Sequence, residues 1–204
     1  MHNISIAGTG LWHPKDIITN DELVESYNTY VADFNIANKT QIENGELEEM
    51  QLSSSEFIEK ASGIKTRYVI DKAGILDTNR MMPYVRNEDK DSLSLHAEIG
   101  LIAAKKAMDQ AGISVGDIDA IIVGTSHAPR NYPAIAIEIQ NELGVNGYAY
   151  DILVGCSSTT FAINNAYSDI ASGLANTILV INPEISTPFV NFTQRDKHFI
   201  FGDA

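Results

Sequence analysis

Residues 151–170 constrain the fold most, because their pattern changes from that of a strand to that of a helix within a few positions. An apolar run over 152–154 stops at Gly155, and the only cysteine of the chain, Cys156, follows at once. Apolar residues then recur near helical spacing from Ala162 to Ile170. The pattern predicts a strand, a sharp turn and a helix, with Cys156 where the helix begins.

The predicted turn gives Cys156 the surroundings of a nucleophile. Backbone N–H groups at a helix N-terminus carry partial positive charge, which stabilises a thiolate. Gly155 permits a tight turn, and the small residues that follow leave room for a substrate carbonyl. The arrangement is that of a nucleophile elbow with sulfur in place of the serine oxygen. The alternative is a small buried hydrophobic residue, since a lone cysteine is more often structural.

Strands and helices alternate along the rest of the chain. The predicted strands cover residues 3–7, 64–70, 118–123, 148–154 and 177–181. Predicted helices begin near Leu23, Ser53, Ser92 and Pro133, and glycines 63, 112 and 144 end the last three. Two polar stretches, 35–52 and 74–91, are predicted surface excursions. This alternation is typical of an α/β domain with a largely parallel sheet.

Composition excludes several classes of function. The chain has 204 residues and a formal net charge of −13, which disfavours nucleic-acid binding, because phosphate contacts need a basic surface. No apolar run reaches the length of a membrane span, and no signal peptide is visible. A single cysteine cannot form an intramolecular disulfide, which suits a reducing compartment. We therefore predict a cytoplasmic location.

Other sites find little support in the sequence. The five histidines are scattered and none has metal-ligand spacing, so no metal site is predicted. His96 is expected to be structural, while His127 and His198 lie near strand ends; a Cys–His–Asp hydrolase would need one of these two beside Cys156. A dinucleotide site after the first predicted strand is rejected, because the third glycine of its motif is missing. The chain ends within an apolar strand and a Gly-Asp turn, which predicts a fragment.

An ordered series of motifs resembles the 3-oxoacyl-(acyl-carrier-protein) synthase III family of the thiolase superfamily. The motifs cover nearly the whole chain and lie at residues 4–10, 19–23, 61–67, 107–112, 132–140, 155–157 and 200–203. The resemblance implies an α/β fold that forms the first half of a thiolase-like layered fold, with a mixed, mostly parallel five-stranded sheet and helices on both faces. It implies one N-terminal domain over 1–204, with the C-terminal half absent.

The resemblance also implies roles for particular residues. Cys156 matches the acyl-accepting nucleophile of the family. Phe57 falls at the aromatic position that packs on coenzyme A, and Arg195 matches the arginine on the other side of the adenine. Tyr132 matches the aromatic residue that crosses the dimer interface into the partner's acyl pocket.

One departure from the family pattern concerns the charged contacts to coenzyme A. Ala61 stands where a basic residue is usual. Contacts to coenzyme A or to the carrier protein are therefore expected to shift to Lys60, Lys65 and Arg67. The two excursions are longer than in compact members, which predicts a subgroup that takes longer acyl groups than acetyl.

The implied reaction has two stages and needs no cofactor, since the coenzyme A thioester is a substrate. Cys156 is acylated by acyl-CoA, and malonyl-acyl carrier protein then condenses with the acyl group in a homodimeric enzyme. The catalytic His and Asn of the family match no position here, so this chain alone is expected to be inactive. Two alternatives stay open: a non-catalytic homologue that partners an active synthase, and another acyl-condensing enzyme of the thiolase superfamily.

Overall fold

The structure is a computed structural model that describes residues 4–86 and 92–204, and these residues fall into two compact units. The first unit holds residues 4–12, 92–184 and 204 of the described chain. The second holds residues 13–86 and 185–203. The chain thus enters the second unit twice, from segments that lie far apart in the sequence.

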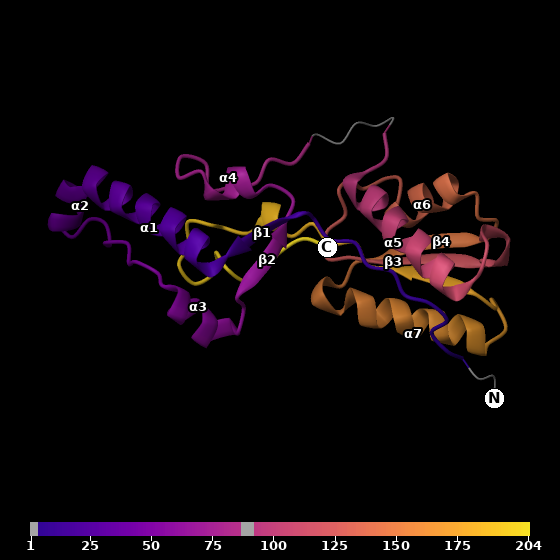
Figure 1. Cartoon of the computed structure of the whole chain (residues 1–204). Helices are drawn as coiled ribbons and strands as arrows, with labels where there is room; N and C mark the ends of the chain where they lie inside the picture. Colours follow the sequence, from indigo (N-terminus) through magenta and orange to yellow (C-terminus); the bar gives the residue numbers. More distant parts are fainter. Residues whose placement is uncertain (1–3, 87–91) are drawn as a thin grey trace. The chain divides into compact units, whose positions relative to one another are not determined.

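A three-stranded parallel sheet forms the centre of the first unit, with strand order β4-β3-β5 (Figure 1). The middle strand β3 (Ala120–Gly124) pairs with β4 (Tyr148–Ile152) and with β5 (Ile178–Ile181). All five residues of β3 are buried, because both of its edges are paired and both of its faces are covered.

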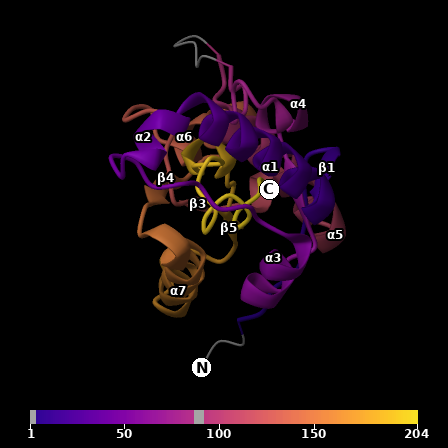
Figure 2. The same ribbon diagram turned by 90° about the vertical axis from the view of Figure 1, so that its left-hand side faces the viewer.

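Helices cover both faces of this sheet. Helices α5 (Leu95–Ala111) and α6 (Ile135–Leu143) lie on one face, and α7 (Ser158–Ala171) lies on the other (Figures 1 and 2). Alternate residues of β3 divide between them: Ile121 and Val123 join the core cluster under α5 and α6, whereas Ile122 packs against α7. Gly112 and Gly144 end α5 and α6 in the left-handed conformation, as the sequence predicts.

The second unit combines a short antiparallel ribbon with four helices. Strand β1 (Asp16–Thr19) pairs with β2 (Thr66–Val69). The helices are α1 (Asn20–Ala37), α2 (Lys39–Glu43), α3 (Ser55–Ser62) and α4 (Lys72–Leu76). Thr19 and Glu22 form a capping box that starts α1. The core cluster of this unit consists of Ile18, Leu23, Tyr27, Val31, Ile58, Val69, Ile75, Met81, Phe192 and Phe199.

The α/β architecture with helices on both faces is confirmed, but a single five-stranded sheet is not. The described residues form one sheet of three strands and one of two. The predicted strand over 3–7 is not seen at residues 4–7, and residue 3 lies outside the described chain. The segment that follows lies against α5, where a Cβ at Gly10 would be 1.9 Å from the Ala103 carbonyl oxygen. It therefore contacts a helix instead of extending the sheet.

The two predicted excursions differ in outcome. In the first, α1 runs on to Ala37 and is followed by α2, which has no buried residue. In the second, α4 ends at Leu76, and residues 87–91 of the stretch lie outside the described chain. None of the helices described is both long and apolar enough to cross a bilayer.

Candidate active site

Cys156 lies in a one-turn 3-10 segment, Gly155–Ser157, that joins β4 to α7. Gly155 has a φ of +60°, a conformation that costs glycine little and other residues more. The thiol is free, and Cys156 is exposed, so it is not the buried hydrophobic residue of the alternative interpretation. The strand, turn and helix that the sequence predicts around Cys156 are all present.

The N-terminus of α7 follows Cys156 directly, and its first N–H group, that of Ser158, donates to the Gly155 carbonyl oxygen. Ser157 is the N-cap residue of this helix and makes no side-chain capping hydrogen bond. The first backbone N–H groups of a helix have no partner within the helix, and they carry the positive end of its dipole. They are therefore suited to hold a thiolate, or the oxyanion that forms when a thiolate attacks a carbonyl.

The turn is tied to the carboxyl end of β3. Ser158, which is buried, accepts a hydrogen bond from Val154 N–H at 2.9 Å, and its Oγ lies 2.9 Å from the Thr125 carbonyl oxygen. A Cβ at Gly124 would lie 2.8 Å from the Ser158 carbonyl oxygen. Only glycine therefore fits at the end of β3, because the start of α7 passes directly over it.

Buried polar groups fill the same unit around the starts of α5 and α6. Glu138 forms an ion pair with Arg130 and accepts from Ser94, the N-cap residue of α5. Asp151 on β4 accepts from Ile135 N–H at 2.7 Å and from Ala136 N–H at 2.8 Å, which caps α6. Burial raises the pKa of Asp151, and these two hydrogen bonds oppose that effect.

His96 lies inside the first unit on α5. Its side chain is 5% exposed, and neither ring nitrogen has a hydrogen-bond partner among the described residues. Burial lowers the pKa of His96 to about 4, and the charge of Glu184 opposes this. His96 is thus neutral near pH 7 and belongs to the core, as the sequence predicts.

The second unit brings Phe57 and Arg195 together from segments that are far apart in the sequence. The Arg195 guanidinium carbon lies 3.8 Å from the centroid of the Phe57 ring, which is the geometry of a cation–π contact. Arg195 Nε donates to the Leu52 carbonyl oxygen at 2.8 Å, and Phe199 contacts the Phe57 ring edge to face. The two residues that the resemblance places on either side of an adenine are therefore neighbours in the structure.

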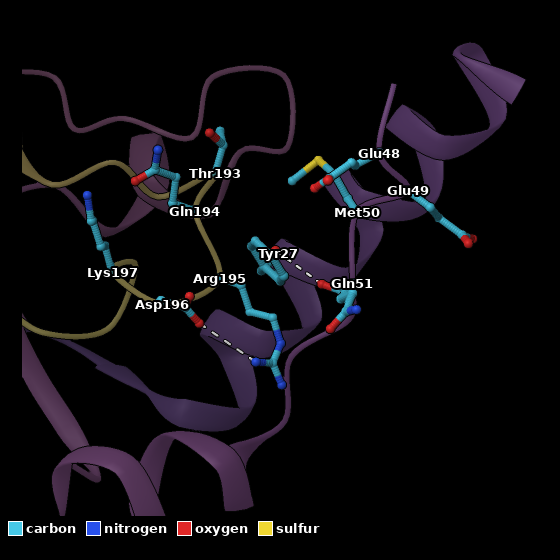
Figure 3. Close-up of a pocket in the computed structure, with 10 residues that line it drawn as sticks. All are labelled: Tyr27, Glu48, Glu49, Met50, Gln51, Thr193, Gln194, Arg195, Asp196 and Lys197. Atoms are coloured by element: carbon cyan, nitrogen blue, oxygen red, sulfur yellow. Dashed lines mark hydrogen bonds and ion pairs between the residues drawn. The ribbon is translucent and has the colours of Figure 1, made fainter. Parts of the chain in front are cut away.

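Arg195 also lines a groove of the second unit (Figure 3). Tyr27 lies between its two walls and donates to the Gln51 carbonyl oxygen at 3.2 Å. Both acidic and basic side chains line the groove, whose residues are Tyr27, Glu48, Glu49, Met50, Gln51, Thr193, Gln194, Arg195, Asp196 and Lys197. Residues 48–51 of this lining belong to the predicted excursion over 35–52. This acidic stretch therefore forms part of the surface around Arg195.

Two of the basic residues expected to compensate for Ala61, Lys65 and Arg67, differ in exposure. Lys65 is exposed and pairs with Glu59 at 3.1 Å. Arg67 is buried at 5% exposure and donates to Asn20 Oδ1 at 2.5 Å and to the Ile18 carbonyl oxygen at 3.3 Å. Burial lowers the pKa of Arg67 to about 10. The guanidinium of Arg67 therefore holds β1 to β2, and of the two only Lys65 is available to a ligand.

Tyr132 and His198 lie in contrasting surroundings. Tyr132 is 87% exposed, at the start of the segment that leads into α6. His198 is buried in the second unit, stacked on Tyr27 with a centroid separation of 4.6 Å. Burial lowers the pKa of His198. Its contacts are those of a core residue, and the structure gives no support to a role as the base of a Cys–His–Asp hydrolase.

The sequence interpretation missed the polar groups that hold the site. Ser158 contacts Thr125 across 33 positions of sequence, and Asp151 caps a helix that begins 16 positions earlier. No local pattern reports such contacts. A small signal was present in the run of four hydroxyl residues after Cys156, because such residues favour helix starts.

Comparisons with known proteins agree on one family. The family model described as 3-oxoacyl-(acyl-carrier-protein) synthase III matches residues 150–204, which include Cys156. A beta-ketodecanoyl-(acyl-carrier-protein) synthase of Pseudomonas aeruginosa is 51% identical over 181 residues, which cover 89% of this chain and 52% of that protein. A beta-ketoacyl-(acyl-carrier-protein) synthase III of Ehrlichia canis is 32% identical over 98% of this chain and 49% of that protein.

A solved structure shows the same fold. The 3-oxoacyl-(acyl-carrier-protein) synthase III of Aquifex aeolicus superposes with a TM-score of 0.70 and 26% identity, covering 97% of this chain and 50% of that chain. The chain spans about half the length of the curated relatives it matches. On the evidence of the turn that carries Cys156, of the fold and of these relatives, the chain belongs to the 3-oxoacyl-(acyl-carrier-protein) synthase III family.

Proposed function

We propose that the protein containing this chain is a condensing enzyme of the 3-oxoacyl-(acyl-carrier-protein) synthase III type, acting in fatty-acid synthesis. The observation that carries this proposal is the exposed thiol of Cys156 at the start of α7, where Ser157 makes no side-chain capping hydrogen bond. Relatives that are named as synthases of this kind support it. In this proposal the chain supplies the nucleophile, as the N-terminal thiolase-like domain of a longer protein.

In the first stage the Cys156 thiolate attacks the carbonyl carbon of an acyl-CoA thioester. The carbonyl π electrons move to oxygen, and backbone N–H groups at the start of α7 bind this oxyanion. When the carbonyl re-forms, the bond to the coenzyme A sulfur breaks, and coenzyme A leaves as a thiolate that takes a proton from water. The products are acyl-Cys156 and free coenzyme A.

In the second stage malonyl-acyl carrier protein loses CO2, and the electrons of the broken C–C bond form an enolate. The enolate carbon attacks the acyl-Cys156 carbonyl, and the Cys156 sulfur leaves as a thiolate. The product is a 3-oxoacyl-carrier protein, and no cofactor is consumed. We assign the groups that stabilise the enolate to residues beyond this chain, so the chain alone is expected not to condense.

The proposed coenzyme A surface is formed by Phe57, Arg195 and Lys65. Guanidinium and aromatic planes both stack on purine rings, so Phe57 and Arg195 are suited to hold an adenine between them. At 3.8 Å the two groups are already in contact, which means that Arg195 has to move away from Phe57 to admit the base. Arg67 is not included, because its guanidinium is bonded inside the unit.

The proposed primer is a medium-chain acyl group. The relative from Pseudomonas aeruginosa is named for a ketodecanoyl product, which has ten carbons. Because decarboxylated malonyl contributes two carbons, such a product arises from an eight-carbon primer. We propose the same class of primer here, in a cytoplasmic homodimer in which the exposed Tyr132 reaches the acyl pocket of the other subunit.

A condensation assay with the full-length protein tests the proposal. Octanoyl-CoA and malonyl-acyl carrier protein should yield 3-oxodecanoyl-carrier protein, detected by intact mass, and Cys156→Ser should abolish the product. Tyr132→Ala should change the preferred acyl length more than the rate with the best primer. A protein that makes no 3-oxoacyl product with primers of two to twelve carbons would instead support a non-catalytic homologue.

A further inference from the structure

The side chain of Ser158 is the main polar link between the Cys156 turn and the sheet. Ser158 is the first residue of α7 and is 2% exposed, although it is polar. Its Oγ accepts from Val154 N–H at 2.9 Å, and its single proton reaches the carbonyl oxygen of Gly155 at 2.8 Å or of Thr125 at 2.9 Å. One hydroxyl thus contacts the residues before the thiol and the end of β3.

The far end of this link is fixed. Thr125 is fully buried, its N–H donates to the Ile152 carbonyl oxygen at 3.2 Å, and its Oγ1 lies 2.8 Å from the Pro183 carbonyl oxygen. Ile152 ends β4, and Pro183 follows β5. Thr125 is therefore tied to both neighbouring strands, and Ser158 joins the turn to this point.

The other hydrogen bonds of the turn among the described residues are local, including one from Ser158 N–H to the Gly155 carbonyl oxygen. The Ser157 side chain makes no capping hydrogen bond, and Ser157 N–H reaches the Val154 carbonyl oxygen only at 3.4 Å. A thiolate gains from helix N–H groups only while these point at the sulfur. The orientation of the Cys156 side chain relative to α7 therefore depends on the contacts that hold Val154 and Gly155, the two residues before it.

We propose that Ser158 is a positioning residue that holds the Cys156 thiolate against the N-terminus of α7. This inference rests on the proposed role of Cys156 as the nucleophile. Ser158 does not touch the substrate; it acts through Val154, Gly155 and Thr125. Replacing its hydroxyl leaves Val154 N–H without its acceptor and frees the turn from β3, so the sulfur loses its fixed position.

Alkylation of the thiol tests this in the full-length protein and needs no acyl substrate. The rate constant for reaction of Cys156 with iodoacetamide near neutral pH is measured by mass spectrometry of the peptide that contains Cys156. Ser158→Ala should lower it by about tenfold, the effect of losing one or two hydrogen bonds that favour the thiolate geometry. Ser157→Ala, next to it, should leave the rate constant unchanged. An unchanged or higher rate constant in Ser158→Ala overturns the proposal.

A stability control separates positioning from general loosening. Ile139 is a fully buried residue of α6, 17 positions before Cys156 in the sequence. Ile139→Val removes one methylene and is expected to lower the unfolding free energy by about 1 kcal/mol. It should not change the alkylation rate constant. If Ile139→Val slows alkylation as much as Ser158→Ala does, Ser158 is only structural and the proposal falls.

If Ser158→Ala does not fold, hydrogen exchange of the backbone amides in the wild-type protein decides the question. The Val154 amide should be protected, because its hydrogen bond goes to the Ser158 hydroxyl. Exchange of this amide at the rate of an open loop overturns the proposal. The alkylation result can also be distinguished from a failure of the proposed function. A lower alkylation rate constant in Ser158→Ala supports the positioning role even if octanoyl-CoA does not react with Cys156.

Discussion

The two units hold their functional residues by different means. In the first unit, Cys156 follows a strand of a parallel sheet whose central strand is buried throughout. In the second, the segment before α3 is fastened to α1 by side-chain amides: Asn28 bonds both backbone groups of Ser53, and Asn35 bonds both backbone groups of Met50. The proposed nucleophile, Cys156, thus lies next to regular structure, whereas the proposed coenzyme A surface of Phe57 and Arg195 is held by single side chains.

This difference has a consequence for function. A nucleophile must stay within a fraction of an ångström of its productive position, and a sheet provides that rigidity. The proposed coenzyme A surface has to open to admit an adenine, which requires restraints that are individually weak. The contact of Arg195 with Phe57 and with the Leu52 carbonyl oxygen is of this kind.

The largest expected effect on stability lies in the first unit. Gly124→Ala should destabilise the protein by about 3 kcal/mol, because the new Cβ would meet the Ser158 backbone at 2.8 Å. Gly116→Ala is the matched control, since its Cβ would meet nothing closer than 3.8 Å. Urea unfolding measures both. Equal losses in the two variants would show that the approach of α7 to β3 is not tight.

A pH-dependent effect also belongs to the first unit. The pKa of His96 is lowered to about 4 in the folded protein and is near 6.5 in the unfolded chain, so the unfolded state binds more protons between these values. Stability should fall as the pH decreases through this window, by about 2 kcal/mol between about pH 6.5 and about pH 5. His96→Leu should flatten this part of the curve. A slope that is unchanged in His96→Leu would contradict the burial of a neutral imidazole.

In the second unit we expect a smaller loss of stability when the side-chain amide of Asn28 is removed. Asn28→Ala should cost about 1.5 kcal/mol of unfolding free energy, because two hydrogen bonds to Ser53 are lost. Asn44→Ala is the control, since among the described residues the Asn44 side-chain amide has one weak hydrogen bond, to Glu46 at 3.4 Å on the surface. Urea unfolding again provides the measurement. A larger loss for Asn28→Ala than for Gly124→Ala would reverse the contrast between the two units.

The smallest expected effect concerns the nucleotide. Phe57→Ala in the full-length protein should raise KM for octanoyl-CoA by about threefold to tenfold, because a stacking surface is lost. With octanoyl-pantetheine, which lacks the adenine, KM should stay constant. Tyr84→Ala removes the other arginine–aromatic pair of the unit, with Arg80 at 4.9 Å, and serves as control. Equal KM changes with both substrates would remove Phe57 from the nucleotide surface.

The sequence predicts the first unit better than the second, and the reason is physical. Buried parallel strands and amphipathic helices leave periodic patterns, so β3, β4, β5 and the ends of α5 and α6 are close to their predicted places. In the second unit the strand predicted over 64–70 is present as β2, but its partner β1 is not predicted. Their pairing joins residues about 50 positions apart, which no local pattern reports.

Arg67 differs from what the family resemblance implies. The resemblance predicts a contact of Arg67 with coenzyme A or the carrier protein, yet the alternation of β2 places Arg67 on the same inward side as Val69. Asn20 and Ile18 accept hydrogen bonds from it there. The position of Phe57 beside Arg195 depends on tertiary packing and came only through the family resemblance.

Acylation of Cys156 is the most direct test of the account. The full-length protein is incubated with octanoyl-CoA without malonyl-carrier protein, digested, and its peptides are analysed by mass spectrometry. The account predicts one octanoyl group on the peptide that contains Cys156, released by hydroxylamine and absent in Cys156→Ser. A Cys156 that stays unmodified with acyl-CoA of every length tried, or an adduct on another residue, would contradict it.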